Sequence, residues 1–344
     1  MNSIIYRKNK QTAKTFLAAT VLLVLLIVLT GMASACSKSP DDSSDADLKI
    51  VTTLFVSFDF ARSIAGDKAD VSILLPPGAD VHTYEPSPQD IILLNQADLF
   101  IYNGGSSEAW VDRLLESEEI NPENTLRMTD FVDLREEVTS GIIQVADDHD
   151  HDHNGKEDHG NEAEGHGPVD EHIWTSPLNA IAMSAAIKDK LVEIDAVNQA
   201  SYEENFSKLQ AGLTELHERF LSIVAAGARD YIVVADRFPL IYFTAEYGLN
   251  YYAAYEACAA QSEPTPKTVT ALIDLVKENN LPYIFTIEFS NERLADQIAA
   301  ESGAEKLLFH TVHNVTQSEI DHGVTYLGLM QQNADNLEKA LADD

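Results

Sequence analysis

Cysteine and positive charge are both scarce in this chain of 344 residues. Its two cysteines, Cys36 and Cys258, are too few for a disulfide scaffold or for a thiolate-rich zinc module. Lysine and arginine number 23 against 56 aspartates and glutamates, which gives a formal net charge of −33. Because such a surface repels phosphate groups, the charge argues against nucleic acid or anionic lipid as the main ligand and suits a cation better.

Catalytic motifs and long apolar runs are lacking as well. No G-x-S-x-G, G-x-G-x-x-G or H-E-x-x-H pattern occurs, so the sequence offers no recognisable enzyme motif. The apolar run at residues 16–29 is about 14 residues long, short of the roughly 20 that span a bilayer. Apolar residues still make up 45% of the chain, which is enough for a sizeable core, and the length suggests about two domains.

The N-terminal segment has the pattern of a secretory signal. Four basic residues precede the apolar run, and small residues follow it up to Cys36. The tripeptide before this cysteine, residues 33–35, resembles a bacterial lipobox with alanine where leucine is usual. We expect residues 1–35 to be a signal peptide, Cys36 to carry lipid, and residues 36–47 to form a flexible tether. These features predict a lipid anchor at the extracytoplasmic face of the cell membrane, with plain signal cleavage as the alternative.

Short apolar runs then alternate with amphipathic stretches of roughly ten residues. Strands are predicted at 49–54, 71–75, 99–102, 231–235, 251–255, 283–287 and 307–309, and helices at 57–65, 87–96, 240–247, 266–278, 291–302 and 324–341. Strands separated by such helices indicate right-handed parallel crossovers. We therefore predict two α/β lobes, each a mostly parallel sheet with flanking helices, at residues 48–195 and 227–344.

One long helix is predicted between the lobes, at residues 196–226. Apolar residues recur there at spacings of three and four and keep one face apolar for about six turns. They are Tyr202, Phe206, Leu209, Leu213, Leu216, Phe220 and Ile223. At 1.5 Å per residue the helix spans roughly 40 Å, enough to run along both lobes; packing on one lobe alone is the alternative.

A histidine-rich tract occupies residues 147–167. It holds five histidines among acids and glycines: His149, His151, His153, His159 and His166. Almost nothing in it is apolar, which predicts a solvated loop. Imidazole and carboxylate at this density suit divalent metals, zinc especially. Because a flexible run lacks fixed geometry, we expect weak and multiple binding; an acidic linker that binds no metal is the alternative.

Two other histidines lie beside the ends of predicted elements. His82 follows a predicted strand and precedes a capped helix, in the stretch PPGADVHTYEPSP. His172 lies in the stretch VDEHIWTSP, where apolar neighbours anchor the backbone. Loops at the carboxyl ends of parallel strands are where α/β sheets bind ligands. We therefore expect His82 and His172 to be metal ligands.

Four segments together resemble the metal-binding lipoproteins of bacterial ABC importers (cluster A-I), most closely the zinc-binding group with a histidine-rich loop. They are residues 75–90, 170–177, 263–266 and 326–341, and the resemblance covers essentially all of the chain beyond the signal segment. It implies two α/β lobes joined by a long helix, with Zn²⁺ held in the cleft by ligands from both lobes. The histidine of the family's H-x-Y-E-P motif falls on His82. The histidine of its D-P-H-x-W motif falls on His172, although Glu171 replaces the proline.

The second lobe departs from the family pattern. Arg237 stands where the family usually supplies histidine or glutamate, and a guanidinium has no lone pair for a metal. The late acidic ligand is also missing, because that stretch reads FHTVHN. We predict that the second-lobe donor is His310, with His313 next. Glu263 and Asp236 are further candidates, unless Asp236 simply pairs with Arg237.

Together these patterns predict a monomeric, lipid-anchored Zn²⁺ receptor that catalyses no reaction, and the resemblance implies an ABC permease as its partner. Imidazole-rich donors favour zinc over manganese, which prefers carboxylates. A manganese, nickel or cobalt receptor of the same fold and a surface adhesin on this scaffold are alternatives. A zinc hydrolase with Glu85 as general base is the enzymatic alternative.

Overall fold

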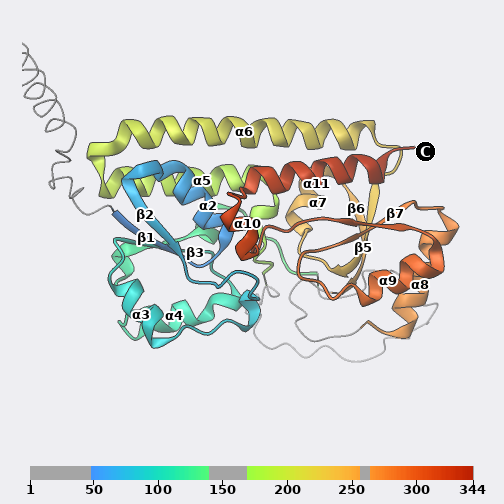
Figure 1. The fold of residues 1–344 in the computed structure, drawn as a ribbon, viewed down its shortest axis with the longest axis horizontal. Coiled ribbons are helices and arrows are strands. Elements are labelled where there is room, and N and C mark those ends of the chain that lie inside the picture. Colours follow the sequence, from blue (N-terminus) through green and yellow to red (C-terminus); the bar gives the residue numbers. More distant parts are fainter. Residues whose placement is uncertain (1–47, 139–168, 256–263, 344) are drawn as a thin grey trace, which may run out of the picture. The chain divides into compact units, whose positions relative to one another are not determined.

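The computed structural model describes residues 48–138, 169–255 and 264–343. These residues form two α/β lobes, each built on a four-stranded sheet, with a long helix running along both (Figure 1). A search of the helices in these ranges finds none that is long and apolar enough to cross a bilayer. The predicted signal peptide, the tether with Cys36, and the histidine-rich tract at 147–167 lie outside the described residues.

The first lobe is a parallel sheet with strand order β2-β1-β3-β4. Its elements are β1 (Leu48–Thr52), α2 (Phe55–Ala65), β2 (Ala69–Ile73), α3 (Pro88–Asn95), β3 (Leu99–Tyr102), α4 (Ala109–Glu116), β4 (Thr125–Arg127) and α5 (Pro177–Ile194). Helix α3 begins with a capping box in which Ser87 and Asp90 satisfy each other's backbone N–H groups. The sequence patterns predicted β1, α2, β2, α3 and β3, but not α4, β4 or α5.

The second lobe repeats this arrangement with strand order β6-β5-β7-β8, again all parallel. Its elements are β5 (Tyr231–Arg237), α7 (Ile241–Tyr247), β6 (Asn250–Tyr255), α8 (Pro266–Glu278), β7 (Tyr283–Thr286), α9 (Arg293–Ser302), β8 (Glu305–Leu308), α10 (Gln317–Asp321) and α11 (Tyr326–Leu341). In each lobe the first strand, β1 or β5, lies inside the sheet and pairs with the next two strands of the chain. Because all the strands are parallel, several of their carboxyl ends lie at the same edge of the sheet. The predicted fold class is confirmed.

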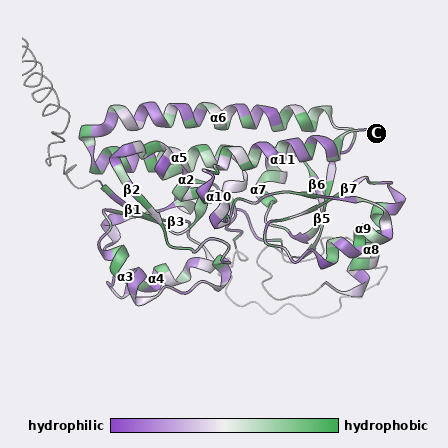
Figure 2. Ribbon diagram, viewed as in Figure 1, coloured by the Kyte–Doolittle hydropathy of each residue, from purple (hydrophilic) through white to green (hydrophobic). Residues whose placement is uncertain are grey.

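Helix α6 (Gln199–Ala226) is the predicted connector between the lobes. Six of the seven residues in its apolar stripe are buried, and Phe206 is partly buried. Figure 2 shows apolar and polar bands alternating along its length. The helix packs against α2 and α5 of the first lobe and against α7 and α11 of the second. The stripe therefore serves both lobes, and packing on one lobe alone is wrong.

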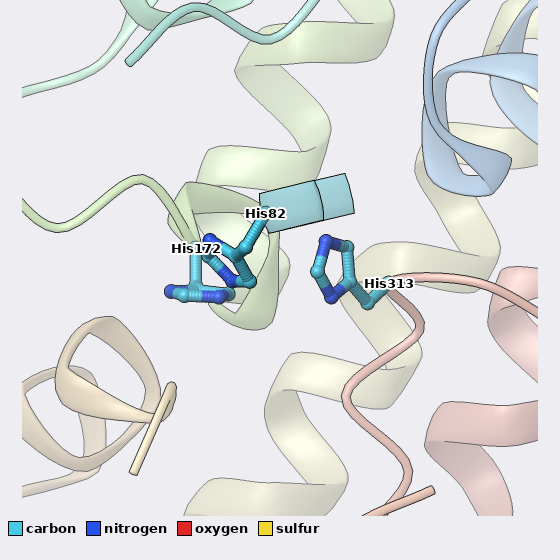
Figure 3. Close-up of side chains that lie close together, drawn as sticks. All are labelled: His82, His172 and His313. Atoms are coloured by element: carbon cyan, nitrogen blue, oxygen red, sulfur yellow. The ribbon is translucent and has the colours of Figure 1, made fainter. Parts of the chain in front are cut away.

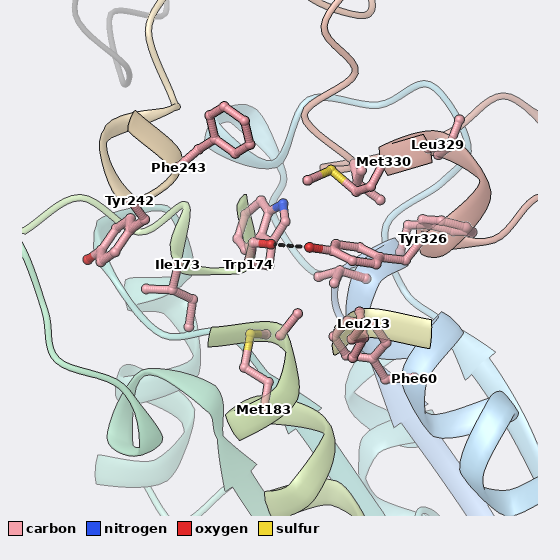
Figure 4. Close-up of a cluster of buried hydrophobic side chains, with 14 of the residues drawn as sticks. Phe60, Ile173, Trp174, Met183, Leu213, Tyr242, Phe243, Tyr326, Leu329 and Met330 are labelled. Carbon is pink, nitrogen blue, oxygen red and sulfur yellow. Dashed lines mark hydrogen bonds between the residues drawn. The ribbon is translucent and has the colours of Figure 1, made fainter. Parts of the chain in front are cut away.

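The first turn of α11 forms a second connection between the lobes (Figure 4). The backbone N–H of Tyr326 donates to the carboxylate of Asp59 at 2.7 Å, and its ring packs edge-on against Phe60 with centroids 5.0 Å apart. The Tyr326 hydroxyl donates to the carbonyl oxygen of Trp174 at 2.7 Å. Tyr326 is fully buried, so its body also fills the core between the lobes. Two helices, rather than one, therefore hold the lobes together.

Candidate metal centre

Three histidines from separate segments come together between the lobes (Figure 3). His82 lies in the short 3₁₀ turn Val81–Thr83 between β2 and α3, and His172 directly precedes the turn Ile173–Thr175. His313 lies in the loop between β8 and α10. One ring nitrogen from each lies within 4.8 Å of the others, so the three imidazoles form a compact group of possible metal donors.

Asp80 and Asn314 fix the loop that carries His82. The carboxylate of Asp80 caps the turn by accepting the backbone N–H of His82 at 3.0 Å. The side-chain amide of Asn314, from the second lobe, donates to the carbonyl oxygens of Pro76 and Ala79 at 2.8 and 2.9 Å. The position of His82 therefore depends on a residue that lies more than 230 positions further along the chain.

Asp170 orients the ring of His172. One oxygen of its carboxylate accepts the backbone N–H of His172 at 2.8 Å and lies 3.1 Å from the ring Nδ1. A histidine that donates Nδ1–H to a carboxylate keeps Nε2 available for a metal. Burial lowers the pKa of His172, but the carboxylates of Asp170 and Glu171 together outweigh it, Asp170 more strongly, and the pKa is raised overall. The Asp170 carboxylate therefore makes the ring a better electron donor.

Glu171 holds the backbone beside His172, at the position where the family has proline. Its carboxylate accepts hydrogen bonds from the Ser106 hydroxyl at 2.9 Å and from the backbone N–H of Ser107 at 3.2 Å. Its carbonyl oxygen accepts the side-chain amide of Asn103 at 2.8 Å. Gly105 makes this approach possible: its φ is +115°, and a Cβ there would lie 2.8 Å from the Cβ of Glu171.

The loop that carries His313 adopts an unusual backbone conformation. Val312 has a φ of +60°, which β-branched residues rarely adopt. Glu288 supports the loop by accepting the backbone N–H groups of Thr311 at 2.7 Å and His313 at 3.3 Å. The backbone N–H of Val312 donates to Nδ1 of His310 at 2.9 Å. These hydrogen bonds hold the turn that directs His313 into the cluster.

His313 has a ring nitrogen suited to a ligand that the protein itself does not supply. Its Nε2 is inaccessible to solvent and has no hydrogen-bond partner among the described residues. Burial, followed by the charges of His172 and His82, lowers the pKa of His313 well below its usual range. The ring is therefore neutral and carries an unused buried nitrogen. Such a group calls for an explanation, and metal coordination provides one.

His310 lies outside the cluster, although the sequence ranked it ahead of His313. Its backbone N–H donates to Asn333 of α11 at 2.7 Å, and its carbonyl oxygen accepts the Asn333 amide at the same distance. Its Nδ1 accepts the Val312 N–H, so the neutral ring carries its proton on Nε2 and has no spare lone pair. The geometry therefore favours the reverse order, with His313 facing the first-lobe histidines and His310 supporting the loop.

The remaining candidates do not join the three histidines in the described structure. Asp236 is buried and accepts the backbone N–H of Arg237 at 2.8 Å, and burial raises the pKa of its carboxyl group. Glu263, Cys36 and the five tract histidines lie outside the described residues. The sequence analysis missed Glu288 and Asn314, whose roles depend on loops that only the folded chain brings together.

A cavity of about 190 Å³ opens in front of the three histidines. Arg237 and Thr311 also line it, and Phe289 lies at its edge with 48% exposure. A tetrahedral zinc ion with bonds of about 2.05 Å needs ligand nitrogens roughly 3.4 Å apart, so shifts of about 1 Å would adapt this cluster. Three neutral imidazoles suit a borderline divalent ion better than a hard one. The residues present thus fit a zinc ion.

Comparison with known proteins places the chain among zinc-uptake components. The zinc-binding lipoprotein AdcA of Streptococcus pneumoniae is 28% identical over 308 residues, which are 89% of this chain but only 58% of that protein. The high-affinity zinc uptake system protein ZnuA of Bacillus subtilis is 28% identical over 325 residues, 93% of this chain and 96% of that one. The crystal structure of the metal-dependent lipoprotein YcdH from Bacillus subtilis matches with a TM-score of 0.69 at 27% identity, covering 86% of this chain and 100% of that one.

The family profile described as zinc-uptake complex component A, periplasmic, matches residues 50–340. That range contains both sheets, the long helix and the three clustered histidines. The chain therefore belongs to the family of zinc-uptake complex component A.

Proposed function

We propose that this chain is an extracytoplasmic receptor that binds one Zn²⁺ ion between its lobes and delivers it to an ABC permease. His82, His172 and His313 are the proposed ligands. The observation that carries the proposal is the cluster itself: three histidine ring nitrogens lie within 4.8 Å of one another, and the Nε2 of His313 is buried with no hydrogen-bond partner among the described residues. Membership of a zinc-uptake family supports it, as do the names of two relatives, one a zinc-binding lipoprotein and the other a zinc uptake system protein.

Zinc is the proposed ion because of the donor set. The cluster offers three imidazoles and, among the described residues, no carboxylate within the same ligand distance. Imidazole suits zinc, whereas manganese prefers carboxylate oxygens. A nickel or cobalt ion would accept the same donors, so a direct comparison of metals belongs in the test.

The proposal includes a lipid anchor on Cys36, a monomeric receptor and weak zinc capture by the tract at 147–167. It also holds that the ion is cargo and that no reaction is catalysed.

The general base of the hydrolase alternative, Glu85, has a side chain that is 79% exposed and lies 3.9 Å from Arg113. Glu85 is not among the residues that line the cavity, so it is poorly placed to activate a metal-bound water.

The test is zinc affinity, measured by competition with a chromophoric chelator on the whole chain in detergent. His82→Ala, His172→Ala and His313→Ala should each weaken zinc by more than the roughly 10–100-fold typical of losing only a supporting partner. His322→Ala is the matched control, because His322 is exposed at the end of α10. Native mass spectrometry of the protein titrated with zinc and with manganese then gives the number of ions bound and the preference between the two metals. Wild-type affinity in His313→Ala would overturn the ligand assignment, and wild-type affinity in all three would overturn the cleft site.

Two further variants test the segments outside the described structure. Replacing residues 147–167 with a glycine–serine linker of equal length should lower the number of zinc ions bound and leave one tight site. Loss of the tight site would show that the tract supplies one of its ligands. Cys36→Ala should release the protein from membranes or leave its precursor unprocessed, whereas normal processing with normal membrane retention would contradict the anchor.

A further inference from the structure

Arg237 is the only lysine or arginine among the residues that line the cavity beside the three histidines. It ends β5, and its side chain is 24% exposed. Its guanidinium Nη1 lies 3.4 Å from the carboxylate of Asp80, at the long end of a hydrogen bond. A positive charge beside a site for a dication is unfavourable by itself, so its presence needs a physical reason. A role for Arg237 at this site rests on the proposed function, the binding of zinc by the three histidines.

The described residues alone provide an incomplete ligand set for zinc. Three imidazoles give three neutral donors, whereas a closed zinc site has four ligands. The nearby described carboxylates are already engaged. They are Asp170 with His172, Glu171 with Ser106 and Ser107, Glu288 with the Thr311 and His313 backbone, Asp80 with the His82 backbone and Arg237, and Asp236 with the Arg237 backbone. In the described part of the chain, no carboxylate oxygen joins the ligand cluster. Held by these three donors alone, a bound zinc ion would keep a vacant position and its full charge.

The cavity has room for more than the ion. Its volume is about 190 Å³, whereas a water molecule occupies roughly 30 Å³ in the liquid. The side-chain hydroxyl of Thr311 is engaged by Glu288, so it is not a free partner for the ion. Space for several heavy atoms thus lies in a cavity lined both by the histidines, which would hold the metal, and by Arg237, which cannot bind a metal.

We propose that a small carboxylate-type oxyanion fills this space when the metal is bound. One of its oxygens would complete the coordination of the zinc ion, and the other would accept hydrogen bonds from the Arg237 guanidinium. The planar fork of a guanidinium matches an O–C–O group better than any other cationic side chain does. The anion also offsets the repulsion between Arg237 and the dication. Bicarbonate and the carboxylate of a free amino acid share this chemistry; with the amino acid, the cargo would be a metal chelate.

The experiment measures zinc affinity of the whole chain in a carbonate-free, carboxylate-free buffer, and again with added bicarbonate, acetate or glycine. Each value is corrected for the zinc that the anion binds in solution. In the wild type at least one anion should raise the apparent affinity by about tenfold, the size expected for a charged hydrogen bond. Arg237→Gln should abolish the increase, and Arg237→Lys should retain part of it. Arg219→Gln, which removes the same charge from α6 where it pairs with Asp335, should behave as wild type.

Cobalt substitution gives a second readout, because the visible spectrum of Co²⁺ reports its coordination number and ligands. The wild-type spectrum should change on adding the effective anion, and the Arg237→Gln spectrum should not. If zinc affinity increases with bicarbonate alone, or with glycine alone, that anion is identified as the source of the carboxylate group. An affinity that no anion changes, or an equal change in Arg237→Gln, would overturn the inference. The proposed function is judged separately, without added anion: the cleft site fails if tight zinc binding survives in His82→Ala, His172→Ala and His313→Ala alike.

Discussion

Trp174 donates its indole N–H to the carbonyl oxygen of Thr311 at 2.7 Å, across the boundary between the lobes. Trp174 lies two residues after His172, and Thr311 lies two residues before His313, so this bond ties together two proposed ligands. The indole is fully buried, and no water competes for the bond. The two lobes therefore hold their histidines near one another without help from the ion.

Trp174→Phe should loosen this connection. The ring body is kept, but the buried carbonyl of Thr311 loses its donor, which costs about 1–3 kcal/mol of unfolding free energy. Zinc affinity should also fall by roughly tenfold. The free energy needed to bring the two ligands back together is lost from the free energy of zinc binding, and about 1.4 kcal/mol corresponds to a factor of ten. Denaturant unfolding and chelator competition measure the two effects. Trp110→Phe is the control, since the buried Trp110 Nε1 has no described hydrogen-bond partner. Equal losses in both variants would contradict the role of the bond.

Asp170→Asn should weaken zinc binding by about 10–100-fold while leaving the fold intact. The amide oxygen still accepts the backbone N–H of His172, but the negative charge that strengthens the ring as a donor is gone. The chelator competition assay measures the change. Asp189→Asn removes the same charge from an exposed position on α5, where the side chain is 71% exposed, and should have no effect. Unchanged affinity in Asp170→Asn would argue against His172 as a ligand.

His310→Ala should reduce stability more than it reduces zinc affinity. The variant leaves the buried N–H of Val312 without an acceptor, which costs about 1–3 kcal/mol. His310→Asn should recover part of that stability, because its amide oxygen accepts a hydrogen bond. Zinc affinity in both variants should stay well above that of His313→Ala. If His310→Ala loses tight zinc binding as fully as His313→Ala with no loss of stability, His310 is a ligand after all.

Glu108 should make stability depend on pH near neutrality. Burial raises the pKa of its carboxyl group to about 7, from an ordinary value of 4.5. Between these two values the folded state binds a proton that the unfolded state does not, so stability falls as pH rises from about 4.5 through 7. The full effect is about 3 kcal/mol. Urea unfolding at pH 5 and pH 8 should show a smaller loss in Glu108→Gln than in wild type.

The control for that measurement is Glu116→Gln, which removes a carboxylate from an exposed position on the adjoining helix α4. It should keep the wild-type pH dependence. A wild-type pH dependence in Glu108→Gln as well would place the titrating group elsewhere. The amide that replaces Glu108 can still accept the backbone N–H of Gly104, so the variant keeps its main hydrogen bond.

The three first-lobe elements that the sequence patterns did not predict were missed for identifiable physical reasons. Helix α5 lies beside α2 and α6. Its buried residues, such as Ala180, Met183 and Ile187, are interspersed with apolar residues that are exposed or only partly buried, such as Leu178 and Ile181, so no single apolar stripe stands out in the sequence. Strand β4 is only three residues long. Helix α4 is eight residues long and begins after a 3₁₀ turn, without a side-chain cap to mark its start.

Local patterns in the sequence determined the two parallel sheets, the apolar stripe of α6 and the positions of His82 and His172 beside element ends. These features depend on neighbours close in the chain, where the period of apolar residues and the caps act directly. The tertiary structure decided which second-lobe histidine faces them. That choice depends on Val312 at positive φ, on Glu288 and on Asn333, which lie far apart in sequence. Side-chain direction in such a loop is set by long-range hydrogen bonds, and no local pattern encodes them.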